Sequence, residues 1–600
     1  MTGTAVTLNK HFDVWPKRLP KDVCTPDTTL WANLDITVRR YPDRPAFVFF
    51  DRVLTYRELN LRVEALAGWL QKIAGVATGD RVALCMQNSP QFVIGYYAIL
   101  RADAVVVPVN PMNKAAELTH YITDPAARVA IVGSDLAALW VAANDEVIAA
   151  APDAGLHHLL VTRYSDEMTE RRLPEIGIPD AWRSWLDLHV DLPTYGTHWR
   201  QAMATQHEAD APTAGPDDLA VLPYTSGTTG LPKGCMHTHR TIMHNVVSGA
   251  LWGDGTAESV SLAVVPMFHI TGMLYGLHTP IYLGSCAVIM PRWDRDLAGR
   301  MISHYRVNSW TMVPTMIIDL LGSPNVANYD LTSLAYIGGG GAAMPQAVAE
   351  NLWQKFGLRF VEGYGLTETA APSHSNPPDN PKQQCLGVPY IGVDSRVVNP
   401  DTLAPCDIGE SGEIVIHGPQ VFKGYWQNRA ATEAAFVEID GKSFFRSGDM
   451  GRVDEDGYFF MTDRLKRMIN ASGFKVWPAE VEALFFRHPA VQEACIIATK
   501  DAYRGESVKA VIVLRANAKD TTEKDIIDWA HTNMAAYKAP RVVEFVDALP
   551  KSGSGKVMWR ALQEREALQE REAVQQRGVV QERGALQEPY AEKRAEKSEP

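Results

Sequence analysis

The sequence YTSGTTGLPKG, residues 224–234, is the stretch on which the prediction of fold and function depends. It combines hydroxyl side chains, which donate hydrogen bonds to anions, with glycines, whose backbone N–H groups can turn toward an anion, and with one lysine. The residues concerned are Thr225, Ser226, Gly227, Thr228, Thr229, Gly230, Lys233 and Gly234. Together they predict a cradle for the phosphates of a nucleotide.

The spacing of this cradle differs from that of the Walker phosphate loop, in which glycine, four residues and Gly-Lys-Ser/Thr follow one another. Here Lys233 follows Pro232 and precedes Gly234. The strand-to-helix geometry of the Walker loop is therefore not implied. A polar surface turn is the alternative interpretation, because Ser, Thr, Gly and Pro often cluster in turns.

The bulk composition limits the classes to which the chain can belong. Its 600 residues exceed what one hydrophobic core usually supports, so at least two domains are expected. The formal net charge of -12 argues against a nucleic-acid partner, because phosphate backbones require a basic surface. The 7 cysteines are scattered without CxxC spacing and favour neither a disulfide scaffold nor a zinc site.

The sequence carries no recognisable targeting or membrane-spanning segment. The opening MTGTAVTLNKHFDVWPKRLP lacks the apolar core of a secretory signal. No run of about 18 apolar residues, the length that a transmembrane helix needs, occurs in the sequence. We therefore expect a cytoplasmic protein without a transmembrane segment.

Short apolar runs alternate with helical patterns over most of the chain. RPAFVFF, YRELNLRVEALAGWLQ and DRVALCM follow one another near the N-terminus, and SLAVVPMFH, SCAVIMP, NSWTMVP and SLAYIGGGG follow the cradle. This alternation is typical of an α/β fold with mostly parallel sheets covered by helices. Near Asp463 the pattern changes to shorter segments, which predicts a second, small α+β domain of roughly a hundred residues.

Similar hexapeptides, from ALQERE at Ala561 to ALQEPY at Ala585, fill much of the C-terminal part of the sequence. On an α-helix, a step of six residues displaces the apolar pair by about 240°, so that successive copies point in different directions. No single face becomes apolar. This pattern favours a disordered, low-complexity tail over residues 561–600, with an interaction helix as the alternative.

Six further stretches follow the cradle in sequence: VVPMFHITG, GGGGAAMP, VEGYGLTET, FRSGDMG, DRLKRMINASGFKVWPAEVE and LPKSGSGK. With the cradle, they resemble the motifs of the adenylate-forming (AMP-binding) superfamily, in particular its acyl-CoA synthetase and fatty-acid–CoA ligase branch. The resemblance extends from Tyr224 to Lys556, and the N-terminal third adds only weak matches such as LTYRELN. It implies a large multi-subdomain N-terminal domain over residues 1–463 and a small mobile C-terminal domain over residues 464–560.

The chemistry of this superfamily uses ATP to activate a carboxylic acid. The carboxylate attacks the α-phosphorus, pyrophosphate leaves, and the acyl-adenylate then reacts with the thiol of CoA. Two anions must be brought together, so the protein positions them and neutralises charge. The resemblance implies ATP and CoA as co-substrates and Mg²⁺ as the cation, with Glu368 of GYGLTE as its ligand. A glutamate favoured in a helix first turn is the alternative for Glu368.

Further positions are assigned to the nucleotide by their place in these motifs. Tyr364 resembles the ring that stacks on adenine, and Thr367 resembles a phosphate contact. Asp449 resembles the carboxylate that accepts hydrogen bonds from both ribose hydroxyls, and Arg464 a second ribose contact. The remaining predicted nucleotide contacts are Gly339, Gly340 and Gly365, besides Thr225, Ser226, Gly227, Thr229, Gly230 and Lys233 of the cradle.

The predicted catalytic set adds three residues to Glu368. Lys556, in PKSGSGK, resembles the lysine that neutralises charge during adenylation. Thr228 belongs to the cradle, and His269, in PMFHITG, resembles the residue that flanks the acyl-adenylate, with a buried core histidine as the alternative. PKSGSGK also resembles the acetylation site of bacterial acyl-CoA synthetases, so that a protein acetyltransferase acting on Lys556 is a candidate partner.

The resemblance also implies that the C-terminal domain swings between the two half-reactions. The pivot would be Lys466, two residues after Arg464. In the second state the segment around Gly473 and Lys475 would replace Lys556, with Gly473 leaving space for the pantetheine arm of CoA. Rigid-body rotation about a few interdomain residues is an established way to switch between such states.

The acyl pocket is predicted around Met273, Trp310 and Gly341. The neighbouring apolar residues offer no cation to a second carboxylate, which favours a medium- to long-chain fatty acid. Met273 stands where some long-chain members carry a gating tryptophan. An aryl-CoA ligase and an acyl-AMP ligase that loads a separate carrier protein remain alternatives. A luciferase-like monooxygenase and a non-catalytic scaffold fit the motifs less well, and a homodimer is a further prediction.

Overall fold

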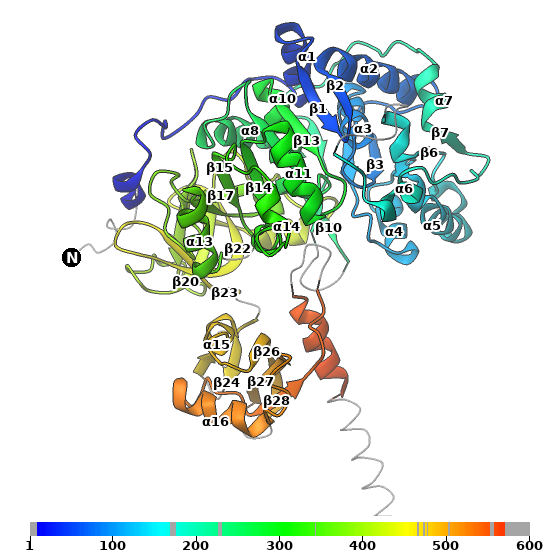
Figure 1. Ribbon diagram of the computed structural model, residues 1–600. Helices are drawn as coiled ribbons and strands as arrows, with labels where there is room; N and C mark the ends of the chain where they lie inside the picture. Colours follow the sequence, from blue (N-terminus) through cyan, green and yellow to red (C-terminus); the bar gives the residue numbers. More distant parts are fainter. Residues whose placement is uncertain are drawn as a thin grey trace, which may run out of the picture. The chain divides into compact units, whose positions relative to one another are not determined.

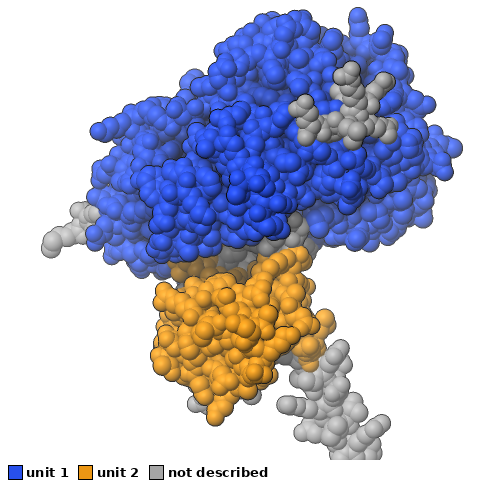
Figure 2. All heavy atoms as spheres, in the orientation of Figure 1, with its two compact units in different colours: residues 1–447, 452–460 blue, residues 448–451, 461–600 orange. Residues whose placement is uncertain are grey.

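The computed structural model describes residues 9–168, 176–225, 231–341, 344–464, 467–471, 474–476, 478–501, 505–551 and 557–569. The chain divides into two compact units (Figures 1 and 2). Unit 1 comprises residues 1–447 and 452–460, and unit 2 comprises residues 448–451 and 461–600. Each unit has a hydrophobic core of its own. No helix in the described part of the chain is both long enough and apolar enough to cross a membrane.

The larger sheet of unit 1 is mainly parallel (Figure 1). Its strand order is β18-β17-β16-β15-β14-β12-β13-β1-β2, and neighbouring strands from β16 to β1 run parallel. The strands are β1 (Pro45–Phe49), β2 (Arg52–Thr55), β12 (Val260–Ala263), β13 (Cys286–Ile289), β14 (Ser309–Met312), β15 (Tyr336–Gly339), β16 (Phe360–Leu366), β17 (Ala371–Ser375) and β18 (Val388–Pro389). The four apolar runs predicted after the cradle supply β12, β13, β14 and β15.

A second sheet of unit 1 has the order β11-β8-β4-β3-β5-β6-β7. All of its pairs are parallel except that of β11 with β8. The strands are β3 (Arg81–Cys85), β4 (Val105–Pro108), β5 (Val129–Gly133), β6 (His158–Thr162), β7 (Gly196–His198), β8 (Leu219–Val221) and β11 (His237–Thr238). The two sheets confirm the predicted α/β class with mostly parallel strands.

One continuous core joins the two sheets. It contains Phe47 and Val288 of the larger sheet and Val82 and Ile131 of the second sheet. The helices of unit 1 are α1 (Leu30–Arg40), α2 (Tyr56–Lys72), α3 (Pro90–Arg101), α4 (Ala115–Thr123), α5 (Ala137–Ala150), α6 (Asp180–Leu186), α7 (Trp199–Ala204), α8 (His239–Trp252), α9 (Ile270–Met273), α10 (Thr279–Leu283), α11 (Arg295–Tyr305), α12 (Pro314–Leu321), α13 (Gln346–Phe356) and α14 (Arg429–Ala435).

Helix α3 illustrates how the sequence determines this arrangement. Every residue of PQFVIGYYAILR is buried, as is expected of a helix that is apolar on all sides. The helix begins after Ser89, whose hydroxyl accepts a hydrogen bond from the N–H of Phe92, and Pro90 occupies the first turn. Helix α3 therefore lies inside the shared core and not on the surface.

A smaller sheet has the order β19-β20-β22-β21, with β23 paired to β22. Its strands are β19 (Asp394–Val398), β20 (Gly412–His417), β21 (Phe436–Ile439), β22 (Lys442–Val453) and β23 (Phe459–Arg464). Strands β22 and β23 contribute residues to both units. The chain thus passes from unit 1 into unit 2 through paired strands.

Unit 2 is a small α+β domain. Its sheet has the order β25-β24-β27-β26, and β28 lies parallel to β27. The elements are β24 (Ile469–Ala471), β25 (Phe474–Val476), α15 (Pro478–Phe485), β26 (Val491–Asp501), β27 (Gly505–Leu514), α16 (Glu523–Asn533) and β28 (Val542–Phe545). Buried aliphatic side chains of both helices and of β24, β26, β27 and β28 form the core.

A helix over residues 559–569 continues the fold of unit 2 into the hexapeptide repeats. Leu562 packs against side chains of β26 and β27 in a separate apolar cluster. Gln563 exchanges two hydrogen bonds with the backbone of Ala498 (2.8 and 2.9 Å). Lys509 forms ion pairs with Glu566 and with Glu544 (2.9 Å to Glu544). The prediction of an unpacked tail is therefore wrong for residues 561–569, and residues 570–600 lie outside the described part.

The rotation between successive repeats explains which copy packs. Leu562 and Leu568 occupy the same position in the first and second hexapeptides. Leu562 is 3% exposed, whereas Leu568 is 57% exposed. Six residues do not complete a whole number of helical turns, so the two side chains point in different directions. The leucine of the first repeat therefore packs against the sheet of unit 2, and the leucine of the second repeat is exposed to solvent.

We predict that Leu562→Ala lowers the free energy of unfolding of unit 2 by about 2–4 kcal/mol, because the substitution leaves a cavity beside the sheet. The matched control Leu568→Ala should change it by less than about 0.5 kcal/mol, since that side chain is exposed. Hydrogen exchange of peptides from β26 and β27 in the full chain measures both values. Equal effects of the two substitutions would contradict the packing described here.

Candidate functional site

The phosphate cradle predicted from the sequence begins and ends in a short hairpin. Strands β9 (Tyr224–Thr225) and β10 (Lys233–Gly234) pair antiparallel, with Thr225 opposite Lys233. The hairpin therefore brings a predicted hydroxyl and the predicted lysine to one place at the base of the loop. The other cradle residues, Ser226, Gly227, Thr228, Thr229 and Gly230, lie outside the described residues.

Side chains of α4 and the residue that follows it hold the base of this hairpin. The hydroxyl of Tyr224 donates to Asp124 Oδ2 (2.5 Å). His120 donates from Nε2 to the carbonyl oxygen of Pro232 (2.7 Å). The rings of His120 and Tyr224 also meet edge to face, with centroids 5.6 Å apart. Both ends of the loop are thus attached to the same neighbouring helix.

A distant segment of the chain pairs with the residues that follow the cradle. Met236 donates its N–H to the carbonyl oxygen of Gly424 (3.0 Å), and Trp426 donates its N–H to that of Gly234 (2.8 Å). Cys235 and Tyr425 lie opposite each other as an isolated antiparallel bridge. This pairing puts the side chain of Tyr425 beside Lys233.

Tyr425 connects the cradle lysine to the predicted magnesium ligand. Its hydroxyl donates a hydrogen bond to Glu368 Oε1 (2.9 Å), and the Lys233 ammonium lies 4.5 Å from the centroid of its ring. Burial, together with the neighbouring carboxylate of Glu368, raises the pKa of Tyr425. The hydroxyl therefore stays protonated and remains a donor. The sequence analysis missed Tyr425, for which the glycine-aromatic run KGYW was the available signal.

The turn that carries Glu368 is held by a hydrogen bond from His237. It follows β16 and forms one 3-10 turn over Thr367–Thr369. His237 donates from Nε2 to the carbonyl oxygen of Thr367 (2.7 Å), and burial lowers the pKa of this histidine to about 4. Because Nε2 donates to a carbonyl oxygen, a neutral His237 carries its proton there, and Nδ1 lies 3.1 Å from the oxygen of Thr241, whose hydroxyl donates to the carbonyl oxygen of Thr238 (2.9 Å).

Glu368 can supply one of the carboxylate ligands that Mg²⁺ takes from a protein. Mg²⁺ usually takes one or two protein carboxylates and completes its shell with phosphates and water. Glu368 is a buried carboxylate next to the cradle hairpin, which is where such phosphates are expected. Among the described residues, no group of three or more His, Cys, Asp or Glu side chains could hold a metal by itself.

Gly339 and Gly340, predicted for the nucleotide site, differ in their surroundings from Gly341, predicted for the acyl pocket. A Cβ atom on Gly339 would lie 1.8 Å from the carbonyl oxygen of Met312, and one on Gly340 would lie 2.3 Å from that of Gly363. These two positions therefore require glycine because strands of the sheet approach closely. A Cβ on Gly341 would meet no atom within 4 Å, although its φ of +85° favours glycine.

The other described nucleotide-site predictions lie on or after strands of the sheets. Tyr364 is buried in β16, and Gly365 and Thr367 follow it toward the turn. Asp449 is buried in β22, and Arg464 ends β23, the strand paired to β22. Lys475 lies in β25, within unit 2. Lys466, Gly473 and Lys556 fall outside the described residues.

His269 is exposed and begins α9. Its Nδ1 accepts a weak hydrogen bond from the N–H of Thr271 (3.4 Å). A histidine at the N-terminal cap of a helix is placed by local backbone geometry and remains accessible. The alternative of a buried core histidine therefore does not describe His269.

A pocket in unit 1 opens between α8, the π-helical turn Leu274–His278 and the strands β12, β14 and β15. Its cavity volume is about 70 Å³, and the hollow around it is partly open to solvent. Glycines and hydroxyl side chains dominate its wall, including Gly249, Gly272, Gly276, Tyr275, Thr311 and Tyr336. None of the described residues that line it is charged.

The two described side chains predicted for the acyl pocket point elsewhere. Met273 is buried, and its sulfur accepts a hydrogen bond from the hydroxyl of Tyr96 (3.2 Å). Trp310 is buried and stacks on Trp293, with ring centroids 5.8 Å apart. Both residues therefore fill the core beside the pocket. Side chains alternate across a strand, which explains why Thr311 lines the pocket and its neighbour Trp310 does not.

Comparison with known proteins identifies the family. Residues 34–426 match the AMP-binding enzyme family, and residues 480–556 match the AMP-binding enzyme C-terminal domain. The chain belongs to the AMP-binding enzymes. It is 34% identical to a long-chain-fatty-acid–CoA ligase of Bacillus subtilis over 92% of this chain and 97% of the relative. It is also 34% identical to a feruloyl-CoA synthase of an Amycolatopsis species, over 85% of this chain and 94% of the relative.

Solved structures of other AMP-binding enzymes share this fold. The ATP-bound MatB of Rhodopseudomonas palustris superposes with a TM-score of 0.76 at 28% identity, covering 90% of this chain and 99% of MatB. A fatty acyl CoA synthetase of Mycobacterium tuberculosis gives a TM-score of 0.65 at 28% identity, again over 90% of this chain and 99% of that chain. These relatives place the chain in the acyl-CoA synthetase branch of the family, whose members are acid–thiol ligases.

For this AMP-binding enzyme we predict that Tyr425→Phe raises the Kd for ATP in the presence of Mg²⁺ about tenfold, because Glu368 loses a charged hydrogen bond. Tyr458→Phe is the matched control, since it removes a hydroxyl that donates to the carbonyl oxygen of Asn380 (2.6 Å). That control should leave the Kd unchanged. Calorimetric titration of ATP into both variants decides the matter, and an unaltered Kd in Tyr425→Phe would speak against a positioning role.

Proposed function

We propose that this chain is an ATP-dependent acyl-CoA synthetase. It would convert a carboxylic acid and ATP into acyl-adenylate and pyrophosphate, and then acyl-adenylate and CoA into acyl-CoA and AMP. The observation that carries the proposal is the assembly of Lys233, Tyr425 and Glu368 at the base of the cradle in a chain of the AMP-binding enzyme family. Relatives named as CoA ligases along nearly the whole chain support it.

In the first half-reaction the protein must bring a carboxylate to the triphosphate. Both are anions, so positive charge and hydrogen-bond donors must be fixed where they meet. We assign the cradle hydroxyls, Thr228 among them, and Lys233 to the phosphates. Lys556 would neutralise charge on the reacting carboxylate and phosphate. Mg²⁺ held by Glu368 would supply further positive charge at the phosphates.

The remaining site residues keep the roles that their motifs suggest. Asp449 and Arg464 would bind the ribose, Tyr364 would stack on the adenine, and Gly339, Gly340 and Gly365 would let the backbone pass close to the nucleotide. His269 would lie beside the acyl-adenylate, in keeping with its exposure at the start of α9. Buried Asp449 offers two acceptor oxygens, as ribose binding requires.

The second half-reaction requires a path for the thiol of CoA. We propose that unit 2 rotates about Lys466, so that the segment with Gly473 and Lys475 replaces Lys556 at the site. Paired strands β22 and β23 lead from unit 1 into unit 2, and Lys466 follows them directly. A rotation at that point would move the part of unit 2 that follows Lys466, which contains the core of that unit.

The pocket beside β12 and β14 is the proposed acyl site. Its described lining carries no charge, which disfavours dicarboxylic and amino acids and favours an alkyl chain. Gly249 of α8 and Gly276 of the π-helical turn add no side chain to this wall. A medium- to long-chain fatty acid is therefore the substrate that we propose, as in the long-chain-fatty-acid–CoA ligases that resemble the chain.

An aromatic acid is the second candidate, because the same wall carries hydroxyl groups. Tyr275, Thr311 and Tyr336 could accept or donate hydrogen bonds to a phenol of a coumarate-like acid. The feruloyl-CoA synthase relative is consistent with this alternative. Release of AMP with a panel of straight-chain and hydroxycinnamic acids distinguishes the two candidates. Loading of a separate carrier protein, a homodimer and a cytoplasmic location stay predictions.

Lys556→Ala is expected to lower acid-dependent pyrophosphate release by about 10²-fold or more, because it removes the charge that stabilises the adenylation transition state. Thioester formation from pre-made acyl-adenylate should change little. Lys551→Ala, which breaks a surface ion pair with Glu493 (2.8 Å), is the matched control and should retain both activities. Acetylation of Lys556 should have the effect of the alanine variant. Equal losses in both half-reactions would refute the assigned role.

Gly249→Leu tests the acyl pocket. A Cβ at Gly249 would lie 3.3 Å from the ring of Tyr275, so a larger side chain would project into the pocket. We expect kcat/KM for a long-chain acid to fall at least about tenfold, while that for a short acid stays within about twofold, since only the long chain reaches this depth. The short acid serves as the internal control. Equal reductions for both acids would place the acyl chain elsewhere.

A further inference from the structure

A second pocket lies at the carboxyl edge of the sheet that contains β5, β6 and β7. Its cavity volume is about 190 Å³, and the hollow around it is partly open to solvent. Its wall includes Ser134, Arg163, Asp166, His189, His198 and Arg200. Ser134 directly follows β5, Arg163 directly follows β6, and His198 ends β7. In sheets of this kind, ligands bind outside the carboxyl ends of the strands.

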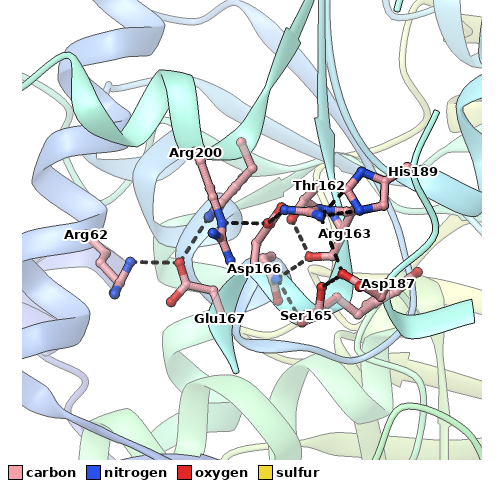
Figure 3. A network of polar contacts seen from close by, with 12 residues as sticks. Arg62, Thr162, Arg163, Ser165, Asp166, Glu167, Asp187, His189 and Arg200 are labelled. Carbon is pink, nitrogen blue, oxygen red and sulfur yellow. Dashed lines mark hydrogen bonds and ion pairs between the residues drawn. The ribbon is translucent and has the colours of Figure 1, made fainter. Parts of the chain in front are cut away.

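Charged side chains of both signs surround the pocket. Asp166 lies between two guanidinium groups, accepting from Arg163 (2.7 Å) and from Arg200 Nε (2.8 Å) (Figure 3). Arg163 also donates to His189 Nε2 (2.7 Å) and, more weakly, to Asp187 (3.4 Å). These contacts fix Arg163 and orient Arg200. The two terminal nitrogens of Arg200 have no partner among the described residues, and its side chain is largely exposed.

Ser134 gives an independent indication of a ligand. The residue is 2% exposed, and its hydroxyl has no hydrogen-bond partner among the described residues. A buried hydroxyl without a partner costs free energy, so a ligand that forms a hydrogen bond with this hydroxyl would be favoured. Helix α5 begins three residues later, at Ala137, and the N-terminus of a helix favours anions. A buried hydroxyl and guanidinium donors thus line one pocket, and α5 begins three residues after the hydroxyl.

We propose that this pocket binds the dianionic end of a phosphate monoester. Guanidinium donors match phosphate oxygens in pairs, and a tetrahedral phosphate can accept from Arg200 and Ser134 together. Ser134 and Arg163 follow two strands and Arg200 lies on helix α7, so these donors come from different directions. A carboxylate is disfavoured, because its two acceptor oxygens lie in one plane. Asp166 and Asp187 formally balance the two arginines, so the donors that remain for an anion are the terminal nitrogens of Arg200 and the Ser134 hydroxyl.

Two sources could supply such a group. Inorganic phosphate or a small phosphate ester in solution is one, and the 3′-phosphate of CoA is the other. Only the second source rests on the proposed function. The anion site itself belongs to unit 1 and is defined by described residues on one sheet edge. It is separate from the cradle hairpin, with which it shares no residue.

Calorimetric titration of the full chain with inorganic phosphate tests the site, with ATP present in excess so that the nucleotide cradle is filled. We expect wild-type protein to bind phosphate and Arg200→Ala to raise the Kd about tenfold or more. Arg183→Ala is the matched control, since Arg183 is an exposed arginine of the neighbouring α6 that pairs with Asp180 (3.0 Å) and does not line the pocket. That control should leave the Kd unchanged.

Ser134→Ala separates binding from fold stability. If the hydroxyl serves only the fold, its loss should destabilise the unliganded protein, whereas an unpartnered hydroxyl should be removed at little cost. We expect an unchanged melting temperature and a weakened affinity for phosphate. Wild-type protein that does not bind phosphate, or variants Arg200→Ala and Ser134→Ala that bind it normally, would overturn the proposal.

Titrations with CoA and dephospho-CoA distinguish the two sources. Tighter binding of CoA in wild type, with the difference abolished by Arg200→Ala, would identify the 3′-phosphate as the occupant. Equal binding of the two compounds, with phosphate binding retained, would assign the pocket to a free phosphate or a small phosphate ester. Failure of ATP to bind would count against the proposed function without affecting the result for phosphate.

Discussion

The candidate nucleotide site depends on one backbone pairing between segments far apart in the chain. Hydrogen bonds of Gly234 and Met236 with Trp426 and Gly424 fix the chain after the cradle. As a result Tyr425 lies with its ring against Lys233 and its hydroxyl on Glu368. The pairing thus gives the buried carboxylate of Glu368 the Tyr425 hydroxyl as a donor, and a buried charge is costly unless it is hydrogen-bonded. The arrangement thus places a cation, a donor and a carboxylate where phosphates are expected.

The large core of unit 1 gives this pairing a rigid support. Helix α3 is buried on all sides between the sheets, and one cluster of apolar side chains connects both. Loops at the carboxyl edges of the strands can then carry polar groups without loss of the core. The turn with Glu368 follows β16 of one sheet, and Ser134 and Arg163 follow β5 and β6 of the other. Both candidate sites therefore use the same property of parallel sheets.

Unit 2 shows how a charged group can be accommodated at a sheet. Lys509 is buried in β27, and burial disfavours its charge, but Glu566 and Glu544 outweigh that effect and raise its pKa. Glu566 comes from the terminal helix, so removal of the helix would leave the ammonium with one carboxylate. Buried ion pairs contribute little net stability, but loss of one partner is costly. The terminal helix is accordingly part of the folded unit, although its sequence belongs to a repeat.

The sequence by itself determined the class of the fold, because the alternation of apolar runs with helical patterns is a local property. DRVALCM and SCAVIMP became β3 and β13, and the YRELN segment became α2 with Thr55 as its cap. The ordered motifs also determined the family. Only the tertiary structure decided which side chains meet. Tyr425 reaches Glu368 through long-range pairing, Trp310 and Met273 turn into the core and away from the pocket, and the first repeat packs because Leu562 faces the sheet. These outcomes depend on which face of an element is covered by another, and the spacing of residues along the chain does not contain that information.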